Sequence, residues 1–577
     1  MLEFYPSRTV ARLAWHHCDT PPSQAPLCRD SRTGVFHHAV ESGSDSRAGA
    51  VRMPFRRLRG YNAPVDKDSG RRPVAGAVAA TPLQRGDLNG DMTGHMNRRE
   101  LLAGLAALGL TAIPLKTAAG GASVNILWRN GWAILNIGDI GHVPGALALL
   151  RHYIPEAAIT LWAQHDLVFR GNSAERARFP DGVIDAGSVS RKVYPELRVV
   201  RGTVDEAGRG DNPELDAAIA SADIMVIGSG AGVLQPLDLL RFQDRTKKPV
   251  GLFGVTTDSF NFTSFREGEA SNDVKALRAA SFVFTRERTS LRLLDGEDVD
   301  GPGGDLVDNP RTTVNEAINR VPIGLDFGGV NKAFVPDTTF AFTARDEAAA
   351  DRFMGAHALE EGKFVCFVPR HRWTPTGTPT RQGDSRDVYN AYYLEEDHDK
   401  LKVAITTYIR KTGHKVALVP ETVYMTGKLG PLMRDGLPAD VAGRVAVMEG
   451  YWMPDAAQSV YARAQAVVSI ENHSPILAAA AGTPFVMVHQ PEDSFKGDMF
   501  IDIGLGDWYI RDINTASGED IARVLIGIVD DMPAARAKLG KAMEFVRERH
   551  RVGMLEVRRT LGLAPPAAAG YPERIYR

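Results

Sequence analysis

The fold is decided by the stretch VVSIENHSPILAAAAGTPFVMV, which runs from Val467 to Val488. The apolar run VVSI at its start and the run FVMV at its end are typical of buried strands. Between them, Ser474 and Pro475 favour the N-cap and the first turn of a helix, and Gly482 favours the helix end. The stretch therefore predicts a strand, a helix and a second strand, the unit from which parallel sheets are built.

The same alternation of apolar runs and helical segments continues on both sides. The runs that favour strands are VNILWR, AAITLWA, ADIMVIG, KPVGLFGV and SFVFTRE in the first half, and FVCFVPR, KVALVPE, RVAVMEG, VVSI and FVMV in the second. The segment between residues 319 and 337 lacks a clean period. We therefore expect an α/β fold of two doubly wound, Rossmann-like domains in series, at residues 123–325 and 326–518, with a helical tail at 519–577.

The N-terminal part of the chain has a different character. Residues 1–95 are rich in Arg, Ser, Pro and Gly without any period, which indicates either disorder or a natural start further along the chain. Residues 96–122 place Arg98 and Arg99 before an apolar segment and then small residues, the layout of a twin-arginine-like signal. This pattern predicts export to the periplasm or cell envelope, with a cytoplasmic location as the alternative.

The bulk composition narrows the classes of function. A chain of 577 residues exceeds one ordinary core, and a formal net charge of −2 offers nucleic acid no basic surface. The three cysteines form no Cys-x-x-Cys pair, so we expect neither a disulfide framework nor a thiolate zinc site. Because the histidines are scattered and no His-Glu-x-x-His segment occurs, we expect no metal. Beyond residues 96–122, no apolar run is long enough to cross a membrane.

In doubly wound sheets, ligands bind beyond the carboxyl ends of the strands, so residues at those ends are candidates for a site. Asn136, Gly138 and Asp139 follow the first expected strand. Gly138 permits a tight turn, and Asp139 either caps a helix that starts near Val143 or binds a ligand hydroxyl. His142, beside them, is expected on the surface.

Three glycines follow the strand ADIMVIG, within the segment from Gly228 to Gly232. Backbone amides in such a turn can approach an anionic or sugar-like ligand closely, which makes Gly228, Ser229 and Gly230 candidate binding residues. The spacing does not match the dinucleotide-binding fingerprint, and a tight turn between strand and helix explains the glycines equally well.

Arginines end two further strands. Arg286 follows SFVF at the start of a helix, where it can clamp a phosphate or a carboxylate or form a surface pair with Glu287. Arg370, His371 and Arg372 follow FVCFVP and would oppose an acidic ligand if they face the cleft. A solvated strand end is the other reading of these three residues.

Glu471 and His473 end the strand VVSI beside the positive end of the expected helix, where an acidic residue is stabilised. His473 is the better candidate for an acid or a base, because an imidazole titrates near neutral pH. His398, at the start of a charged helix, is expected to be solvated.

Taken in order, these segments resemble the polysaccharide pyruvyl transferase family. The resemblance lies in NIGD at 136–139, GSGAG at 228–232, TRERTS at 285–290, PDTTFAF at 336–342, the strand that ends at Arg370, ENHSPILAAAAGTPFVMV at 471–488, and Lys496. It spans residues 124–507 and rests on the order of the motifs. It implies a fold like that of two-domain (GT-B-like) glycosyltransferases. It also implies transfer of a pyruvyl group from phosphoenolpyruvate to saccharide hydroxyls in cell-surface polysaccharide synthesis, without a further cofactor.

The same resemblance assigns roles to the candidate residues. Arg286 would clamp the donor anion and His473 would transfer protons. Glu471 stands where many members carry an arginine, and a glutamate would repel phosphoenolpyruvate. Arg370 or Arg372 is the candidate replacement from a neighbouring strand. The binding residues that the resemblance implies are Asn136, Gly138, Asp139, Gly228, Ser229, Gly230, Arg370, Glu471 and Lys496.

Two other functions remain open. A glutamate before a small-residue helix and Gly-Thr-Pro also resembles the nucleotide-sugar site of two-domain glycosyltransferases, in which a glutamate holds ribose hydroxyls. The third reading is an exported, non-catalytic carbohydrate-binding protein, which the signal-like segment favours because phosphoenolpyruvate is a cytoplasmic metabolite. In each case the expected partner is a saccharide, with no nucleic acid and no stable membrane span after signal removal.

Overall fold

The computed structural model describes residues 124–170, 183–258, 271–302, 316–319, 325–375 and 385–565, which belong to one compact unit. The segments 1–95 and 96–122, for which we predicted disorder or a later start and a signal, lie outside these residues. Within the described ranges, no helix is both long enough and apolar enough to cross a membrane.

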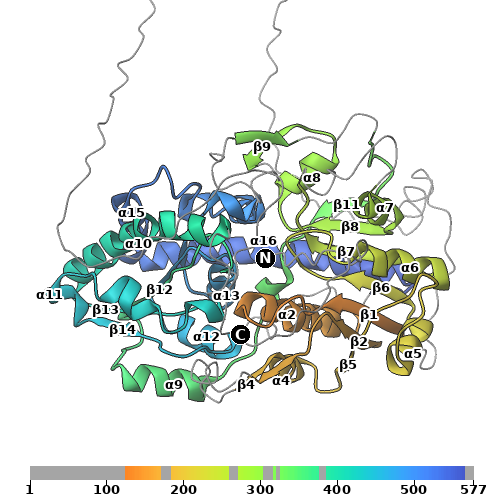
Figure 1. Ribbon diagram of the computed structural model, residues 1–577, viewed down its shortest axis with the longest axis horizontal. Helices are drawn as coiled ribbons and strands as arrows, with labels where there is room; N and C mark the ends of the chain where they lie inside the picture. The colour runs from red at the N-terminus through yellow and green to blue at the C-terminus, as the bar shows by residue number, and fades with distance from the viewer. Residues whose placement is uncertain are drawn as a thin grey trace, which may run out of the picture. The chain divides into compact units, whose positions relative to one another are not determined.

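The first half of the unit is built on a seven-stranded parallel sheet with the order β11-β8-β7-β6-β1-β2-β5 (Figure 1). Its central strands β6, β7 and β8 are buried along their whole length, as strands covered by helices on both faces require. The strands are β1 (Val124–Asn130), β2 (Ala157–Ala163), β5 (Arg198–Val200), β6 (Ile224–Ile227), β7 (Val250–Val255), β8 (Phe282–Thr285) and β11 (Lys332–Phe334).

Helices connect these strands, and polar side chains cap several of them. Asn212 caps α5 by accepting from Leu215 N at 2.9 Å, and Ser271 caps α7 by accepting from Val274 N at 3.2 Å. The helices are α2 (Ile137–Tyr153), α4 (Ala186–Val193), α5 (Pro213–Ser221), α6 (Pro236–Thr246), α7 (Asn272–Ala279) and α8 (Arg288–Leu294). Two antiparallel pairs, β3 (Val168–Arg170) with β4 (Val183–Asp185) and β9 (Val299–Pro302) with β10 (Glu316–Asn319), lie outside the sheet.

The second half contains a six-stranded parallel sheet with the order β14-β13-β12-β15-β16-β17. Its strands are β12 (Phe364–Val368), β13 (Lys415–Leu418), β14 (Val445–Val447), β15 (Ala466–Ser469), β16 (Phe485–Val488) and β17 (Tyr509–Ile510). The α-helices around it are α9 (Glu347–Ala356), α10 (Ser385–Thr412), α11 (Ala439–Ala442), α12 (Pro454–Tyr461), α13 (His473–Ala480), α14 (Met499–Asp502) and α15 (Gly518–Asp530). Shorter helical turns are η3 (Thr338–Ala341), η4 (Val423–Met425), η5 (Gly430–Arg434), η6 (Pro491–Asp493), η7 (Lys496–Asp498) and η8 (Gly506–Trp508).

The prediction of two doubly wound α/β sheets is confirmed. Each sheet has one point at which the strand order reverses, between β1 and β6 in the first and between β12 and β15 in the second. Such switch points are where doubly wound sheets leave a crevice for a ligand beyond the strand ends. The residues that follow these four strands are therefore the residues to inspect.

The structure differs from the sequence-based expectation at the short strands and at the end of the chain. The apolar runs did not reveal β5, β11 or β17, and β11 extends the first sheet beyond the boundary expected at residue 325. The last helix, α16 (Met532–Thr560), is more than a tail, because it contributes to the cores of both halves. Near its end, His550 Nε2 donates to the carbonyls of Pro336 at 3.0 Å and Asp337 at 3.2 Å.

Candidate active site

The helix after β1 begins earlier than its sequence indicated. It starts at Ile137, and Asn136 is its cap, accepting from Gly138 N at 2.7 Å. The expected start near Val143 is therefore wrong, because Asn136 supplies a side-chain acceptor nearly two turns earlier. Asp139, freed from the capping role, is half-buried and accepts no hydrogen bond from the described residues. Of the two roles predicted for Asp139, ligand binding is the one left open.

Glycines on α2 allow a close approach to the second half. A Cβ at position 138 would lie 1.9 Å from Cγ of His473, and a Cβ at position 145 would lie 2.1 Å from the carbonyl oxygen of Thr338. No side chain fits at either distance. Gly138 thus serves the packing of the His473 ring against α2, rather than the tight turn that we expected.

His142 is buried, with 1% of its surface exposed, so its expected surface position is wrong. It lies on the same face of α2 as Gly138 and faces the other half. Its Nε2 lies 2.9 Å from Nε2 of His473 and 3.3 Å from Oδ2 of Asp337. The imidazole therefore joins a carboxylate of the first half to a histidine of the second.

His473 is the first residue of α13, so the helix begins before Ser474 and Ser474 is not its cap. The reason is a competing acceptor, because Oε2 of Glu421 accepts from both N and Oγ of Ser474, each at 2.7 Å. The other oxygen of Glu421, Oε1, lies 3.3 Å from Nδ1 of His473. Gly482 ends the helix with a φ of 82°, as its sequence predicts.

These contacts form one buried chain of polar groups, Asp337–His142–His473–Glu421, which crosses from one half to the other. Burial lowers the pKa of His473 to about 3, and His142 adds to this effect. Burial raises the pKa of Glu421 to about 7 against the hydrogen bonds from Ser474. For Asp337, burial alone would raise the pKa, but His142 and Arg286 together hold it well below its usual value. At neutral pH, His473 is therefore uncharged and Asp337 ionised.

Arg286 lies behind this chain and is 2% exposed, so it is not a surface arginine. Its Nε donates to Oγ1 of Thr256 at 2.7 Å and its Nη1 donates to Oδ2 of Asp337 at 3.2 Å. Its Nη2 has no hydrogen-bond partner among the described residues. Glu287 is 3.7 Å away, and burial raises the pKa of this carboxyl to about 8. One donor of a buried arginine thus remains available.

Arg370 follows β12 and is buried in a second cluster beside the first. Its Nη1 donates to Oδ1 and Oδ2 of Asp493 at 2.9 and 2.7 Å, and it lies 3.2 Å from Oε2 of Glu471. Lys496 also binds Asp493, with its Nζ 2.6 Å from Oδ1. Both cations therefore share the same carboxylate, and Arg370 does not face a ligand as an unpaired charge.

Glu471 ends β15 and keeps one oxygen without a partner. Oε1 of Glu471 and Oδ1 of the neighbouring Asn472 are buried and accept no hydrogen bond from the described residues. Burial raises the pKa of Glu471 to about 8, although Arg370 opposes the shift. The opposing effect of Arg370 is smaller than that of burial, because Asp493 already neutralises this guanidinium. A protonated Glu471 would not repel an anion in the way that its sequence position suggested.

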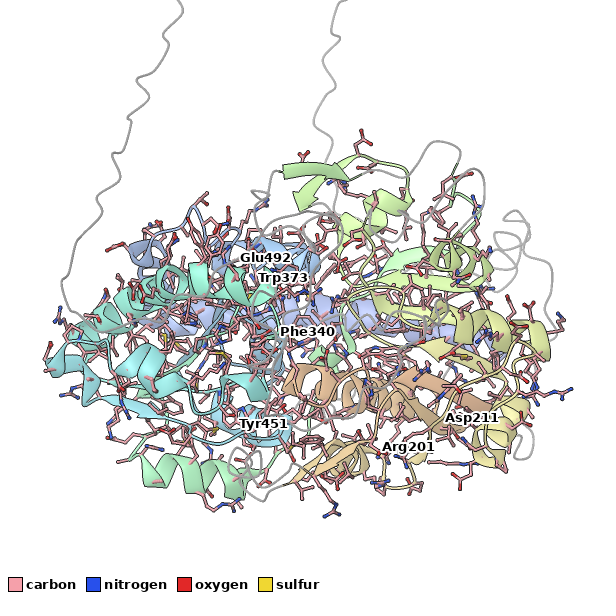
Figure 2. The ribbon with its side chains drawn as sticks, in the orientation of Figure 1. Arg201, Asp211, Phe340, Trp373, Tyr451 and Glu492 are labelled. Carbon is pink, nitrogen blue, oxygen red and sulfur yellow. The ribbon has the colours of Figure 1, made fainter. Side chains whose placement is uncertain are left out.

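Arg372 and His398 lie outside the chain of polar groups and outside the cluster of Glu471. Arg372 donates from Nε and Nη2 to Asp397 at 2.8 and 2.7 Å and from Nη1 to Glu492 at 3.1 Å. Figure 2 labels Glu492 and also Trp373, the residue that follows Arg372 in the chain. Arg372 is therefore a paired, buried cation outside the cluster of Glu471, and it does not replace an arginine there. His398 is 1% exposed, so its expected solvation is also wrong.

The glycine segment after β6 packs against neighbouring loops. A Cβ on Gly228 would lie 2.2 Å from Nδ2 of Asn130, and a Cβ on Gly230 would lie 2.8 Å from Cδ1 of Leu234. Ser229 reaches the chain of polar groups, because its Oγ accepts from the backbone N of Thr338 at 3.2 Å. Packing in a tight turn accounts for these glycines, and Ser229 alone connects them to the site.

A metal ion is a further possibility that the geometry allows us to test. Asp139, His142 and His473 each offer one ligand atom, and these atoms lie within 4.8 Å of one another. Two imidazole nitrogens bound tetrahedrally to zinc at about 2.0–2.1 Å would stand about 3.3 Å apart. The two Nε2 atoms here are 2.9 Å apart, the length of a hydrogen bond. A shared proton therefore fits this pair better than a cation.

Asp337 and Glu421 are the members of the site that sequence reasoning did not single out, and His142 is the member that it expected on the surface. Glu421 follows the β13 run KVALVP closely, so the rule of inspecting strand ends would have found it. His142 lies one helical turn after Asp139, and Asp337 stands in the segment PDTTFAF. Their meeting depends on the packing of two halves, for which a single sequence carries no signal.

No family model and no curated protein match the chain. Among solved structures, a UDP complex of MnaA from S. aureus aligns with 78% of this chain and 100% of its own, at 8% identity and a TM-score of 0.44. A UDP-glucosyltransferase from Polygonum tinctorium aligns with 77% of this chain and 100% of its own, at 10% identity and a TM-score of 0.42. The E. coli ADP-heptose LPS heptosyltransferase II aligns with 71% of this chain and 100% of its own, at 12% identity and a TM-score of 0.36. Likenesses this distant carry no information on a substrate.

Proposed function

We propose that the protein transfers a pyruvyl group from phosphoenolpyruvate to hydroxyl groups of a saccharide, forming a ketal of a cell-surface polysaccharide. The family resemblance suggests this reaction. The structure adds support because residues from segments that carry the resemblance lie together: Arg286 binds Asp337, and Asp337 is linked through His142 to His473. Gly138 packs against the ring of His473.

The observation that carries the proposal is Nη2 of Arg286, which has no hydrogen-bond partner in the described part of the chain. A buried guanidinium rarely keeps a donor without a partner, since an unsatisfied buried donor costs about 1–3 kcal/mol. Its Nη1 already binds Asp337, which is also bound by His142 of the acid–base chain. A phosphate or carboxylate oxygen of phosphoenolpyruvate would complete the hydrogen bonding of Arg286 and place the donor beside the two histidines.

The reaction needs a proton for the methylene carbon of phosphoenolpyruvate and acceptors for the protons of two hydroxyls. Protonation of that carbon leaves positive character on the carbon that bears the phosphate, one hydroxyl adds there, and a second hydroxyl displaces inorganic phosphate. Glu471, kept protonated by burial, can supply a proton. His473, which is uncharged at neutral pH, can accept a proton. Asp139 offers a carboxylate to a sugar hydroxyl.

A nucleotide-sugar-dependent glycosyl transfer is the second candidate. The observation in its favour is the buried pair of unpartnered acceptors at the end of β15, Oε1 of Glu471 and Oδ1 of Asn472. Acceptors of this kind suit the hydroxyls of a ribose or a sugar. Under this function, Glu471 would bind in its ionised form, supported by Arg370.

Turnover followed by ³¹P NMR separates these functions. The protein is incubated with phosphoenolpyruvate and methyl glycosides of glucose, galactose and mannose, and in parallel with UDP- and GDP-sugars. Inorganic phosphate that forms from phosphoenolpyruvate only when a saccharide is present supports pyruvyl transfer. Formation of UDP or GDP with stable phosphoenolpyruvate would assign the second candidate. Saccharide binding without any turnover would leave a carbohydrate-binding protein.

A further inference from the structure

We propose that Nε2 of His473 is the atom that accepts the substrate proton, and that His142, Asp337 and Glu421 are positioning residues that keep its lone pair ready. The proposal deepens the function proposed above, on which it rests for the identity of the substrate hydroxyl. The state of the histidine pair itself can be measured without any substrate.

The contact between the two Nε2 atoms admits one proton. At 2.9 Å, two lone pairs would repel each other, and two N–H groups would collide. One ring must therefore donate and the other accept. The question of which ring donates is settled by what the second nitrogen of each ring meets.

Glu421 decides the state of His473. Its Oε2 accepts two hydrogen bonds from Ser474, so this carboxyl is held as an acceptor and its Oε1 faces Nδ1 of His473 at 3.3 Å. Above its raised pKa of about 7, Glu421 is ionised and Oε1 can only accept, so Nδ1 of His473 carries the proton and Nε2 carries the lone pair. A carboxylate that fixes the tautomer of a catalytic histidine in this way is a recurring device.

His142 has the opposite arrangement. Its Nδ1 is buried and meets no partner among the described residues, whereas its Nε2 faces two acceptors, Nε2 of His473 and Oδ2 of Asp337. A buried N–H without an acceptor is the more costly state, so the proton of His142 lies on Nε2. His142 therefore donates to His473 in the resting protein.

Asp337 provides a second acceptor for the N–H of His142 when a substrate binds. Its Oδ2 lies 3.3 Å from Nε2 of His142, close enough to take over the N–H once a sugar hydroxyl replaces His142 at Nε2 of His473. Asp337 is itself fixed by Arg286 at 3.2 Å and by the backbone N of Thr339 at 2.9 Å. The hydroxyl proton then moves to His473, and the oxygen attacks the donor. The net transfer is one proton from oxygen to nitrogen.

Several charged or titratable groups surround the pair. These groups are Asp139 on α2, Arg286 after β8, Asp337 before η3, Arg370 after β12, Glu421 after β13 and His550 on α16. Burial, His142 and Arg286 disfavour a positive charge on His473, whereas Asp139 and Asp337 favour it. The site thus holds a neutral base at rest, and these two carboxylates offset part of the cost of the charge that His473 gains when it accepts a proton.

The direct test is ¹⁵N NMR of the full-length protein labelled at histidine, with the signals of His473 identified by their loss in His473→Gln. The expected result above pH 7, where Glu421 is ionised, is a protonated Nδ1 and an unprotonated Nε2. Glu421→Gln should reverse this state. The two donors of Ser474 would hold the amide oxygen and turn the NH₂ toward Nδ1. Glu492→Gln, a buried glutamate in the network of Arg372, is the matched control and should leave His473 unchanged.

A second variant keeps the proposal testable if Glu421→Gln does not fold. His142→Gln removes an imidazole that lowers the pKa of His473, so the pH at the midpoint of the His473 titration should move upward.

If the protein transfers a pyruvyl group, Glu421→Gln should lower kcat on the order of 10²–10⁴-fold with little change in KM for the donor.

A protonated Nε2 on His473 in the unmodified protein would overturn the proposal. An unchanged state in Glu421→Gln would do the same. Stoichiometric binding of zinc that shifts both histidines would assign the pair to a metal site instead. A failure to turn over phosphoenolpyruvate, with the expected histidine states intact, would refute the proposed donor and leave the assignment of Nε2 standing.

Discussion

The imidazole of His473 fills the space that a side chain at Gly138 would need, because a Cβ at position 138 would lie 1.9 Å from Cγ of the imidazole. The two residues come from different sheets and are 335 positions apart in the chain (473 minus 138). The position of the candidate base therefore depends on a missing side chain in the helix that follows β1.

Gly138→Ala should displace His473 and destabilise the protein. Overpacking of this kind typically costs about 1–3 kcal/mol, and the displaced ring should lose its contact with His142. Gly355→Ala is the control, because it is also a helical glycine but meets no atom within 4 Å, so it should be neutral or slightly stabilising. Urea unfolding and histidine NMR measure both effects. Equal stability of the two variants would contradict the close contact.

Glu287 should make the stability of the protein fall as the pH rises. Burial raises the pKa of this carboxyl from 4.5 to about 8, so between these values the folded state keeps a proton that the unfolded chain has lost. The stabilising contribution is complete below pH 4.5 and is lost as the pH passes 8. Glu287→Gln cannot titrate, so its free energy of unfolding should change less steeply over this range.

Urea unfolding at a series of pH values measures this effect, with the exposed Glu361→Gln as the control. Glu421 and Glu471 also have raised pKa values, so some slope should remain in Glu287→Gln. Identical slopes in the unmodified protein and in Glu287→Gln would show that Glu287 is ionised in the folded state.

Met554→Ala should destabilise the first half of the unit, although Met554 lies in the last helix. Its side chain is fully buried in the core that contains β1 and α2. Removing a buried methionine side chain costs about 2–5 kcal/mol. Lys541→Ala, at an exposed position of the same helix, should change the stability by less than about 0.5 kcal/mol. A similarly small effect of Met554→Ala would mean that α16 does not support the first half.

The strands of both sheets could be predicted where burial leaves a mark in the sequence. Runs such as FVCFV in β12 are apolar throughout because helices cover both faces, and such runs need no knowledge of their partners. The strands β5 and β11 could not be predicted in this way, because each has only three residues and begins with a charged residue, Arg198 or Lys332. Their place in the sheet comes from pairing with β2 and β8.

Individual residues of the site could be predicted from the sequence, but their spatial arrangement could not. Strand-end reasoning selected Asp139, Arg286 and His473 because rigid strands place such residues at the same edge of a sheet. It misplaced His142, whose neighbours on α2 are polar or small and resemble a surface. The burial of His142 arises from contact between the two halves, a long-range relationship that local periodicity does not encode.

Whether Arg286 binds phosphoenolpyruvate can be measured by calorimetric titration of this compound into the full-length protein. We expect binding that weakens about 10–100-fold in Arg286→Lys, since a lysine keeps the charge but loses the donor at Nη2. The Arg372→Lys variant changes a buried arginine that is paired with Asp397 and Glu492, and it should bind as the unmodified protein does. Binding of UDP- or GDP-sugars with no heat from phosphoenolpyruvate would refute the assignment of Arg286 to this donor.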